Sequence, residues 1–204
     1  MPGQKSTEEQ RRQEILSAAF TVASRERLQG VKVADVAQEA GVSKGLVYFY
    51  FDNKEALLIA LLKWLLEQIL LHRADEPEPT APCQSPRAQF LAVLRRDIER
   101  LPEQKNSVEL LIDYWVMGTR HPDIKRMIRG ALDRYRESLH PYAARLIADE
   151  PQRYEQISAS GLASVAAGFI EGCAIQTAMD MEGFDVEEYL RSLQALIISP
   201  HDAD

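Results

Sequence analysis

Cysteine is scarce in this 204-residue chain, which contains only Cys83 and Cys173. The two lie in different sequence contexts, so the sequence predicts no disulfide framework. Long apolar runs are also missing. The longest candidate, residues 56–71, is interrupted by Lys63 and Glu67, whereas a membrane span needs about 20 apolar residues. The N-terminal residues contain no apolar segment typical of a signal peptide. We therefore expect a cytoplasmic protein without a membrane partner.

Motifs of the common enzyme classes are absent as well. The sequence contains no phosphate-binding glycine loop and no HExxH, CxxC or GxSxG pattern. Its four histidines are scattered along the chain, and such residues are more often structural or solvated than metal ligands. We expect no catalytic residues, no metal site, no cofactor and no enzyme activity.

Excess positive charge is lacking, since the formal net charge is −7. The charge is unevenly distributed. Residues 1–54 hold 8 Lys and Arg against 7 Asp and Glu, whereas residues 55–204 hold 16 against 24. A nucleic-acid-binding surface is therefore expected within the first 54 residues, with modest non-specific affinity because their net charge is only +1.

What the chain does have is a distinctive stretch at residues 33–58, VADVAQEAGVSKGLVYFYFDNKEALL. Gly41 can adopt a positive φ and end a first short helix. Ser43 is a good N-cap for a second helix at about residues 44–51. Apolar residues in the stretch are spaced so that the two helices can pack at a steep angle. This pattern is typical of a helix-turn-helix, whose second helix usually enters the major groove of DNA.

The second of these helices carries more aromatic rings than one core-facing stripe requires. Tyr48 and Tyr50 are too close in sequence to share a face, and with Phe49 and Phe51 they surround one turn. Some of the rings must therefore face something other than the core. Tyrosine hydroxyls can donate hydrogen bonds to phosphate oxygens, which favours a DNA-facing role.

The segment AGVSKGLVYFYFDNKEALL resembles the DNA-binding signature of the TetR family of transcriptional repressors. The resemblance covers about residues 11–62 and continues loosely toward the C-terminus. It implies an all-α protein with a three-helix helix-turn-helix DNA-binding domain at residues 1–53. A larger helical domain for ligand binding and dimerisation would follow at residues 54–204. Such a repressor binds a palindromic operator in double-stranded DNA as a homodimer and is released by a small-molecule effector.

The resemblance also implies which residues contact DNA. Tyr48, Tyr50 and Lys54 would hold phosphates, as the matching family positions do, and Ser43 would add a backbone contact. The predicted DNA-binding set is Lys32, Val33, Ser43, Lys44, Gly45, Tyr48, Phe49, Tyr50 and Lys54.

Within this set, Lys44, Gly45 and Phe49 would face base edges. Lys44 can pair with guanine, and the Phe49 ring can contact a thymine methyl group. The family often has a polar residue where Phe49 stands, so unusual operator readout is expected. Lys32 stands where the family usually has a Ser or Thr that caps the next helix and bonds phosphate. Lys32 cannot cap, but it can reach a phosphate as a point charge.

Beyond residue 54 the chain is rich in aromatic and methionine side chains, which suit an adaptable apolar pocket. The ligand is expected to be small and largely apolar or aromatic. Asp113 interrupts the apolar run LLIDYWVM, and a carboxylate there must be paired, exposed or poised to meet a ligand. The alternatives are a plain helical core for the apolar residues and a salt bridge to an arginine for Asp113. The predicted ligand-binding set is Trp64, Gln68, Phe90, Asp113, Tyr114, Met117, Tyr135 and Phe169.

Small residues recur every four positions at Ser160, Ser164, Gly168 and Gly172, which lets another helix approach closely. A second apolar stripe follows in residues 186–198. Neither helix can hide all its apolar surface in so small a domain, so an intersubunit four-helix bundle is expected. The family resemblance implies the same homodimer. The predicted interface set is Ser164, Gly168, Gly172, Tyr189, Leu190, Leu193 and Ile197.

Two other interpretations of the sequence remain. One is a helix-turn-helix regulator without a small-molecule effector, which a filled second domain would favour. The other is a helical ligand-binding or enzymatic module whose helix-turn-helix has lost its DNA affinity. The N-terminal charge of only +1 and the departure at Lys32 favour this second alternative.

Overall fold

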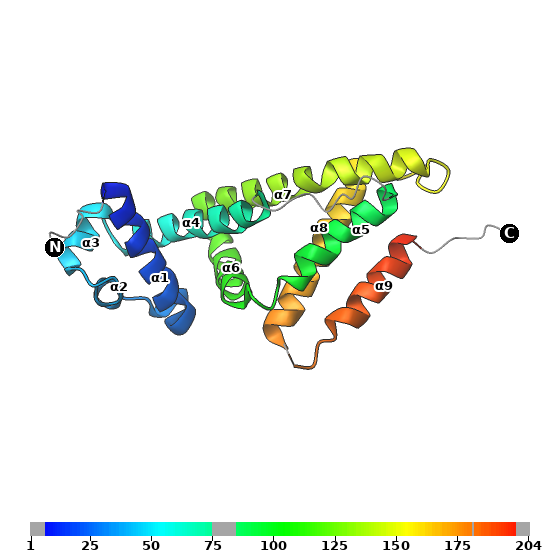
Figure 1. The fold of residues 1–204 in the computed structure, drawn as a ribbon. Coiled ribbons are helices and arrows are strands. Elements are labelled where there is room, and N and C mark those ends of the chain that lie inside the picture. The colour runs from blue at the N-terminus through cyan, green and yellow to red at the C-terminus, as the bar shows by residue number, and fades with distance from the viewer. Residues whose placement is uncertain (1–6, 75–84, 181, 199–204) are drawn as a thin grey trace, which may run out of the picture. The chain divides into compact units, whose positions relative to one another are not determined.

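A computed structural model describes residues 7–74, 85–180 and 182–198, with the side chains of 70–74, 197 and 198 excepted. Within these residues the regular secondary structure is helical and no strand occurs (Figure 1). The prediction of an all-α fold is therefore confirmed for this part of the chain. Contacts divide the chain into two compact units. The first comprises Met1–Asp75 with Glu109–Met127, and the second comprises Glu76–Val108 with Ile128–Asp204. The predicted domain boundary after residue 53 stays a prediction.

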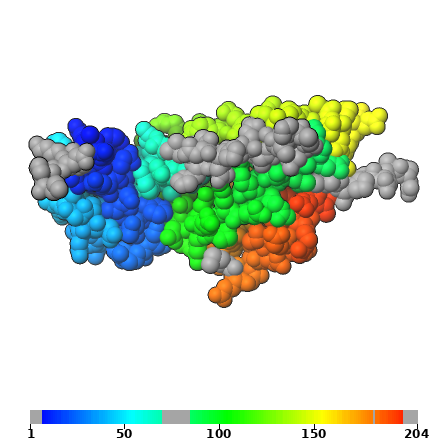
Figure 2. All heavy atoms as spheres, in the orientation of Figure 1, coloured from blue at the N-terminus to red at the C-terminus, as the bar shows by residue number. Residues whose placement is uncertain are grey.

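The first unit is built around helices α1 (Glu8–Gly30), α2 (Val33–Glu39), α3 (Lys44–Tyr50) and α4 (Lys54–Ala74). Helix α1 starts with a capping box, in which Thr7 Oγ1 accepts from the Gln10 N–H and the Thr7 N–H donates to Gln10 Oε1. Helix α1 packs against α2 and α4, and α2 packs against α3. Atoms of α1, α2 and α3 form one continuous surface (Figure 2). Their shared core, which includes Ile15, Val22 and Val36, fixes the position of α3.

The second unit contains α5 (Pro86–Glu99), α8 (Ala159–Met179) and α9 (Val186–Ile198). Helices α6 (Lys105–Gly118) and α7 (Pro122–Asp149) contribute residues to both units. Helix α5 packs against α8 and α9, and α8 packs against α9 (Figure 1). Phe90, Leu94, Leu139 and Cys173 are among the buried residues of one core cluster.

Helix α8 is the most apolar long element among the described residues. By length and composition it could cross a membrane, although the core helix of a water-soluble protein meets the same criterion. In this structure one face of α8 is buried against α5 and α9. The sequence had pointed instead to residues 56–71 as the longest apolar stretch, and to the small residues of α8 as a helix-packing face.

Candidate nucleic-acid interface and helical effector region

The turn before α3 has the local chemistry expected from the sequence. Gly41 lies in it with a φ of +64°. The Val42 N–H donates to the Ala37 carbonyl over 2.9 Å, which closes the end of α2. Ser43 then caps α3, since its Oγ accepts a hydrogen bond from the Leu46 N–H over 3.1 Å. Turn and cap together set the direction in which α3 leaves α2.

Helix α3 directs one side chain into the core and presents several to the outside. Val47 is buried against the unit. Lys44 and Gly45 are exposed, as are Tyr48 at 43% and Phe49 at 73%. Because Lys44, Gly45, Tyr48 and Phe49 all belong to the predicted DNA-binding set, the structure brings the central part of that set together on one short helix.

Contacts between neighbouring side chains fix the outward-facing groups of α3. The rings of Phe49 and Tyr50 meet edge to face, with centroids 5.2 Å apart and planes at 88°. The Lys44 ammonium lies 5.7 Å from the centroid of the Tyr48 ring, within cation–π range. The helix therefore carries a positive charge beside the Tyr48 ring and an exposed aromatic side chain at Phe49.

The remaining predicted DNA contacts lie in different environments. Lys32 is exposed at the N-cap position of α2 and makes no side-chain cap, as expected. Val33 is only 7% exposed, so its side chain packs inward and any DNA contact would use its backbone. The Lys54 ammonium donates to the Gln29 carbonyl over 3.1 Å and so tethers α4 to the end of α1.

Arg27 is a feature that the sequence analysis missed. It has a φ of +61° inside α1, where the helix kinks. Its guanidinium donates to Glu109 Oε2 over 2.7 Å, to the Glu109 carbonyl over 3.0 Å and to Asp113 Oδ1 over 2.8 Å. Asp113 was predicted as a ligand contact from its apolar context, with a salt bridge to an arginine as the alternative. Nothing in the sequence identified Arg27 as that partner.

The first unit holds five of the predicted ligand-binding residues: Trp64, Gln68, Asp113, Tyr114 and Met117. Tyr114 is fully buried, and its hydroxyl donates to the Leu58 carbonyl over 2.7 Å. Burial raises the pKa of Tyr114 above its ordinary value, and the nearby Asp113 carboxylate adds to the rise. The Trp64 ring packs against Phe20 with centroids 5.7 Å apart. Tyr114 and Trp64 thus contribute to the packing of this unit.

The other three predicted ligand-binding residues lie in the second unit. Phe90 is fully buried in its core. The Tyr135 hydroxyl donates to Asp97 Oδ2 over 3.0 Å, and Asp97 is itself buried. Phe169 is partly buried and packs edge-on against Tyr189, with centroids 6.4 Å apart. The predicted set is thus divided between the two units.

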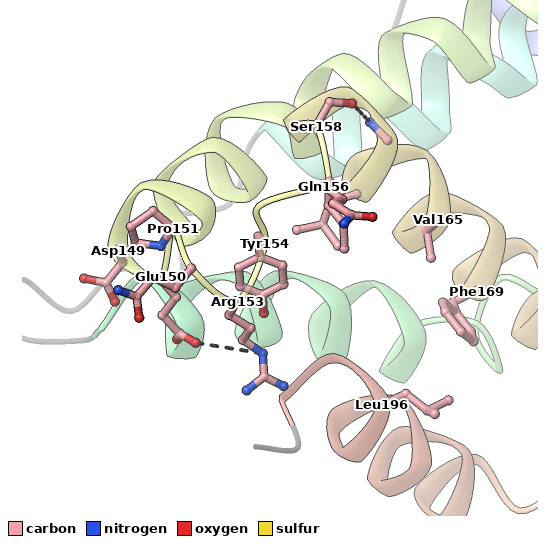
Figure 3. A pocket seen from close by; sticks show the side chains of 14 residues that line it. Asp149, Glu150, Pro151, Arg153, Tyr154, Gln156, Ser158, Val165, Phe169 and Leu196 are labelled. Carbon is pink, nitrogen blue, oxygen red and sulfur yellow. Dashed lines mark hydrogen bonds and ion pairs between the residues drawn. The ribbon is translucent and has the colours of Figure 1, made fainter. Parts of the chain in front are cut away.

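A hollow of about 1240 Å³ lies within the second unit, between the loop after α7, helix α8 and the end of α9 (Figure 3). Phe169 is the predicted ligand-binding residue among those that line it. The other apolar lining side chains are Pro151, Ile157, Leu162, Val165 and Leu196. The hollow therefore has an apolar side formed by α8 and α9.

Charged groups gather at the opposite side of this hollow. Arg153 Nε lies 4.0 Å from Glu150 Oε2 (Figure 3). Arg87 Nε of α5 donates to Glu150 Oε1 over 2.9 Å. Tyr154 lies beside this ion-pair network, and burial raises its pKa. The charges are paired with one another within the loop and α5.

The predicted dimer residues differ in their exposure. Ser164 and Gly168 are exposed on α8, together with Val165. Leu190 and Leu193, in contrast, are buried in the core of their own unit. Gly172 is partly exposed, and the Tyr189 hydroxyl donates to the Phe169 carbonyl. The Ile197 side chain lies outside the described residues. Helix α8 therefore supplies the outward-facing part of the set.

Two protein families match the chain. The family described as "Bacterial regulatory proteins, tetR family" matches residues 15–61. The family described as "BetI-type transcriptional repressor, C-terminal" matches residues 86–199. The first match covers the helix-turn-helix, and the second covers more than half of the chain.

Similar proteins include the HTH-type transcriptional regulators BetI of Cronobacter sakazakii and Stenotrophomonas maltophilia. The first is 25% identical over 177 residues, which is 87% of this chain and 84% of the relative. The second is 26% identical over 168 residues, covering 80% of this chain and 81% of the relative.

Solved structures share the fold. A putative transcriptional regulator from Saccharomonospora viridis in complex with choline superposes with a TM-score of 0.75 at 22% identity, covering 94% of this chain and 96% of that one. The transcriptional regulator FadR from Bacillus subtilis in complex with stearoyl-CoA gives a TM-score of 0.71 at 20% identity, covering 92% of this chain and 98% of that one.

Proposed function

Because the chain belongs to the TetR family of bacterial regulatory proteins, with a C-terminal region of BetI type, we propose that it is a repressor that binds a palindromic operator as a homodimer. The observation that carries the proposal is the outward face of α3, where Lys44, Tyr48 and Phe49 are exposed on a capped recognition helix. A cytoplasmic location is part of this proposal, because the operator DNA would be there. The function proposed is regulation of transcription, not catalysis.

In the proposed complex α3 of each subunit lies in a major groove. Lys44, Gly45 and Phe49 face the base edges. The Tyr48 hydroxyl donates a hydrogen bond to a phosphate. Tyr50 and Lys54, two and six residues further along the chain, contact neighbouring phosphates. This arrangement makes affinity dependent on salt, because each neutralised phosphate releases counterions.

Phosphate contacts in this proposal also come from the start of α2. Lys32 is exposed there and supplies a point charge. Val33 follows it as the first residue of α2, and its backbone N–H has no helical acceptor at that position. Ser43 adds a similar backbone contact at the start of α3. The duplex would thus be held at both edges of the groove that α3 enters.

Dimerisation uses the exposed face of α8 in this proposal. Ser164, Val165 and Gly168 lie on that face, and small side chains let a partner helix approach closely. Leu196 is exposed on α9 and extends the apolar surface. Two copies of these helices would form a four-helix bundle that covers both faces.

The proposed effector is a small ligand with an apolar or aromatic surface that binds in the C-terminal domain and releases the DNA. Aromatic rings of the second unit, such as Tyr135 and Phe169, would provide its contacts. The choline complex of the Saccharomonospora viridis neighbour supports a cation held by aromatic rings as one such ligand. A preference of about 3 kcal/mol for the non-binding state would shift the equilibrium about a hundredfold.

The test is titration of the full-length protein against a palindromic duplex selected by this protein from random-sequence DNA, at several salt concentrations. The wild type should bind tightly and lose affinity as salt rises. Tyr48→Ala should bind about tenfold or more weakly, since it loses a hydrogen bond to a charged group. Lys63→Ala on α4 serves as the control for a surface substitution outside α3. Weak, sequence-independent binding by wild type and Tyr48→Ala alike would overturn the proposal.

The effector proposal has a separate test on the preformed protein–DNA complex. Choline and stearoyl-CoA are the two probes, because they differ in charge and chain length. A probe that acts as proposed should raise the thermal stability of the free protein and lower its DNA affinity. A regulator without a small-molecule effector would show neither change with any probe of a wider panel of apolar and aromatic ligands.

A further inference from the structure

The base-reading chemistry available on α3 is unusually limited. The helix has the sequence KGLVYFY, so it contains no Asn, Gln, Arg, Asp, Glu, His, Ser or Thr. Those residue types supply most hydrogen bonds to base edges in the major groove. Lys44 is the one residue of the helix with a charged side chain. Polar readout by α3 is therefore confined to Lys44 and the two tyrosine hydroxyls.

Phe49 is the most exposed of the large hydrophobic side chains among the described residues, at 73%. A single exposed apolar residue needs no special explanation by itself. Phe49, however, lies in the middle of the recognition helix rather than at an arbitrary place on the surface. Its ring packs at right angles to the Tyr50 ring, so it is partly ordered before any partner arrives.

The charged group of α3, the Lys44 ammonium, is associated with the ring of Tyr48. Lys44 and Tyr48 are four residues apart and therefore adjacent on the helix, and the ammonium lies within cation–π range of the tyrosine ring. Phe49 follows Tyr48 in sequence and so points about a quarter-turn away. The helix thus presents a cationic side and an apolar side next to each other.

The major groove offers one apolar feature, the C5-methyl group of thymine. A phenylalanine ring can neither donate nor accept a conventional hydrogen bond, so opposite a cytosine or an adenine it would leave a base-edge polar group without a partner. We propose that Phe49 reads the 5-methyl group of a thymine in each operator half-site and so determines sequence specificity. This inference rests on the proposed function, since it requires that α3 enters the major groove.

Removal of that methyl group from the DNA is the direct test. Deoxyuridine replaces each thymine of the selected duplex in turn, which removes only the methyl group. At one symmetric pair of positions, the wild type should lose about fourfold in affinity for each half-site, the factor expected for one buried methyl-sized group. Substitution of both half-sites should cost about fifteenfold.

Phe49→Ala and Phe49→Leu separate this effect from a general weakening. Phe49→Ala should bind the thymine and deoxyuridine duplexes equally. Phe49→Leu should retain part of the discrimination, because leucine is also apolar. Val116→Ala, which changes another exposed apolar side chain, on α6, serves as the matched control and should discriminate as the wild type does.

A gain-of-contact arm uses 5-methylcytosine, which carries the same methyl group. Where thymine is replaced by cytosine at the sensitive position, methylation of that cytosine should restore part of the affinity in the wild type and none in Phe49→Ala. Two outcomes would overturn this inference and leave the repressor proposal intact. In the first, the wild type prefers its palindrome but binds the thymine and deoxyuridine duplexes equally at every position. In the second, Phe49→Ala discriminates thymine from deoxyuridine as strongly as the wild type does. A wild type without any palindrome preference overturns both.

Discussion

At the scale of single residues, Tyr114 joins α6 to α4 through a hydroxyl that is buried beside the Leu58 carbonyl. Tyr114→Phe removes this hydrogen bond, and at neutral pH we expect a loss of about 1 kcal/mol in the free energy of unfolding. Urea denaturation monitored by circular dichroism measures it. An unchanged unfolding midpoint would contradict the assigned hydrogen bond.

Tyr114 should also make the free energy of unfolding depend on pH in the alkaline range. Burial raises the pKa of Tyr114 in the folded state, so its contribution is fully present below the unfolded-state pKa of about 10. Above about pH 10 the unfolded chain releases the proton and the folded chain retains it, so stability falls by up to about 1.4 kcal/mol per pH unit. Tyr114→Phe should therefore lose stability less steeply than the wild type between about pH 10 and about pH 11. If the unfolding free energies of the two proteins fall in parallel with pH in this range, the prediction is contradicted.

Ser43 makes a second prediction at this scale. Its Oγ caps α3, and Ser43→Ala should cost about 1 kcal/mol of unfolding free energy. Ser17→Ala is the control, because Ser17 is an exposed serine within α1 and not at its cap. The two variants are compared by thermal and urea denaturation. Equal losses in both would show that the cap does not stabilise α3.

At the scale of elements, the end of α1 is attached to α6 by the Arg27 guanidinium, which bridges Glu109 and Asp113. These side chains are partly exposed, so solvent screening reduces the contribution of the ion pairs. We expect Arg27→Ala to lower the unfolding free energy by about 1–2 kcal/mol. Arg25→Ala, in the same turn and more exposed, should change it by less than about 0.5 kcal/mol. Similar losses in the two variants would contradict the bridging role.

Two substitutions of Arg27 separate the effect of backbone strain on stability from the effect of its ion pairs. A φ of +61° is unfavourable for any residue with a Cβ. Arg27→Gly also removes the ion pairs but relieves the backbone, so it should be more stable than Arg27→Ala by about 1 kcal/mol. Urea denaturation of the two variants side by side measures the difference. If Arg27→Gly is the less stable of the two, the kink is not strained.

Helix ends and turns could be predicted from the sequence where they depend on residues close together in the chain. The positive φ of Gly41 and the Ser43 cap were predictable because each depends on residues within three or four positions. The Arg27 kink was not predictable, because it depends on carboxylates more than 80 positions away. The same limit applies to Leu190 and Leu193. Helical periodicity shows that they share a stripe but not whether that stripe faces its own core or a partner.

At the scale of the whole molecule, Gly168 provides a sharp test of the proposed homodimer. A Cβ added there meets no atom within 4 Å in the described part of the chain, so Gly168→Gln should fold normally as a subunit. If a partner helix packs on this face, the longer side chain should separate the dimer into monomers. Light scattering after size-exclusion chromatography measures the mass.

Gly130→Gln on α7 is the matched control, because a Cβ there makes only an ordinary contact with Arg134. This variant should stay dimeric. A dimeric mass for Gly168→Gln would contradict an interface on the α8 face, and a monomeric wild type would contradict the homodimer itself.

The central claim is that a dimer of this protein lays two copies of α3 in major grooves of one palindromic site. Hydroxyl-radical footprinting on the selected duplex tests it most directly. The account predicts two protected regions related by the dyad of the palindrome, about one helical turn or a multiple of it apart, both lost in Tyr48→Ala. A footprint without two-fold symmetry, or protection that persists unchanged in Tyr48→Ala, would contradict it.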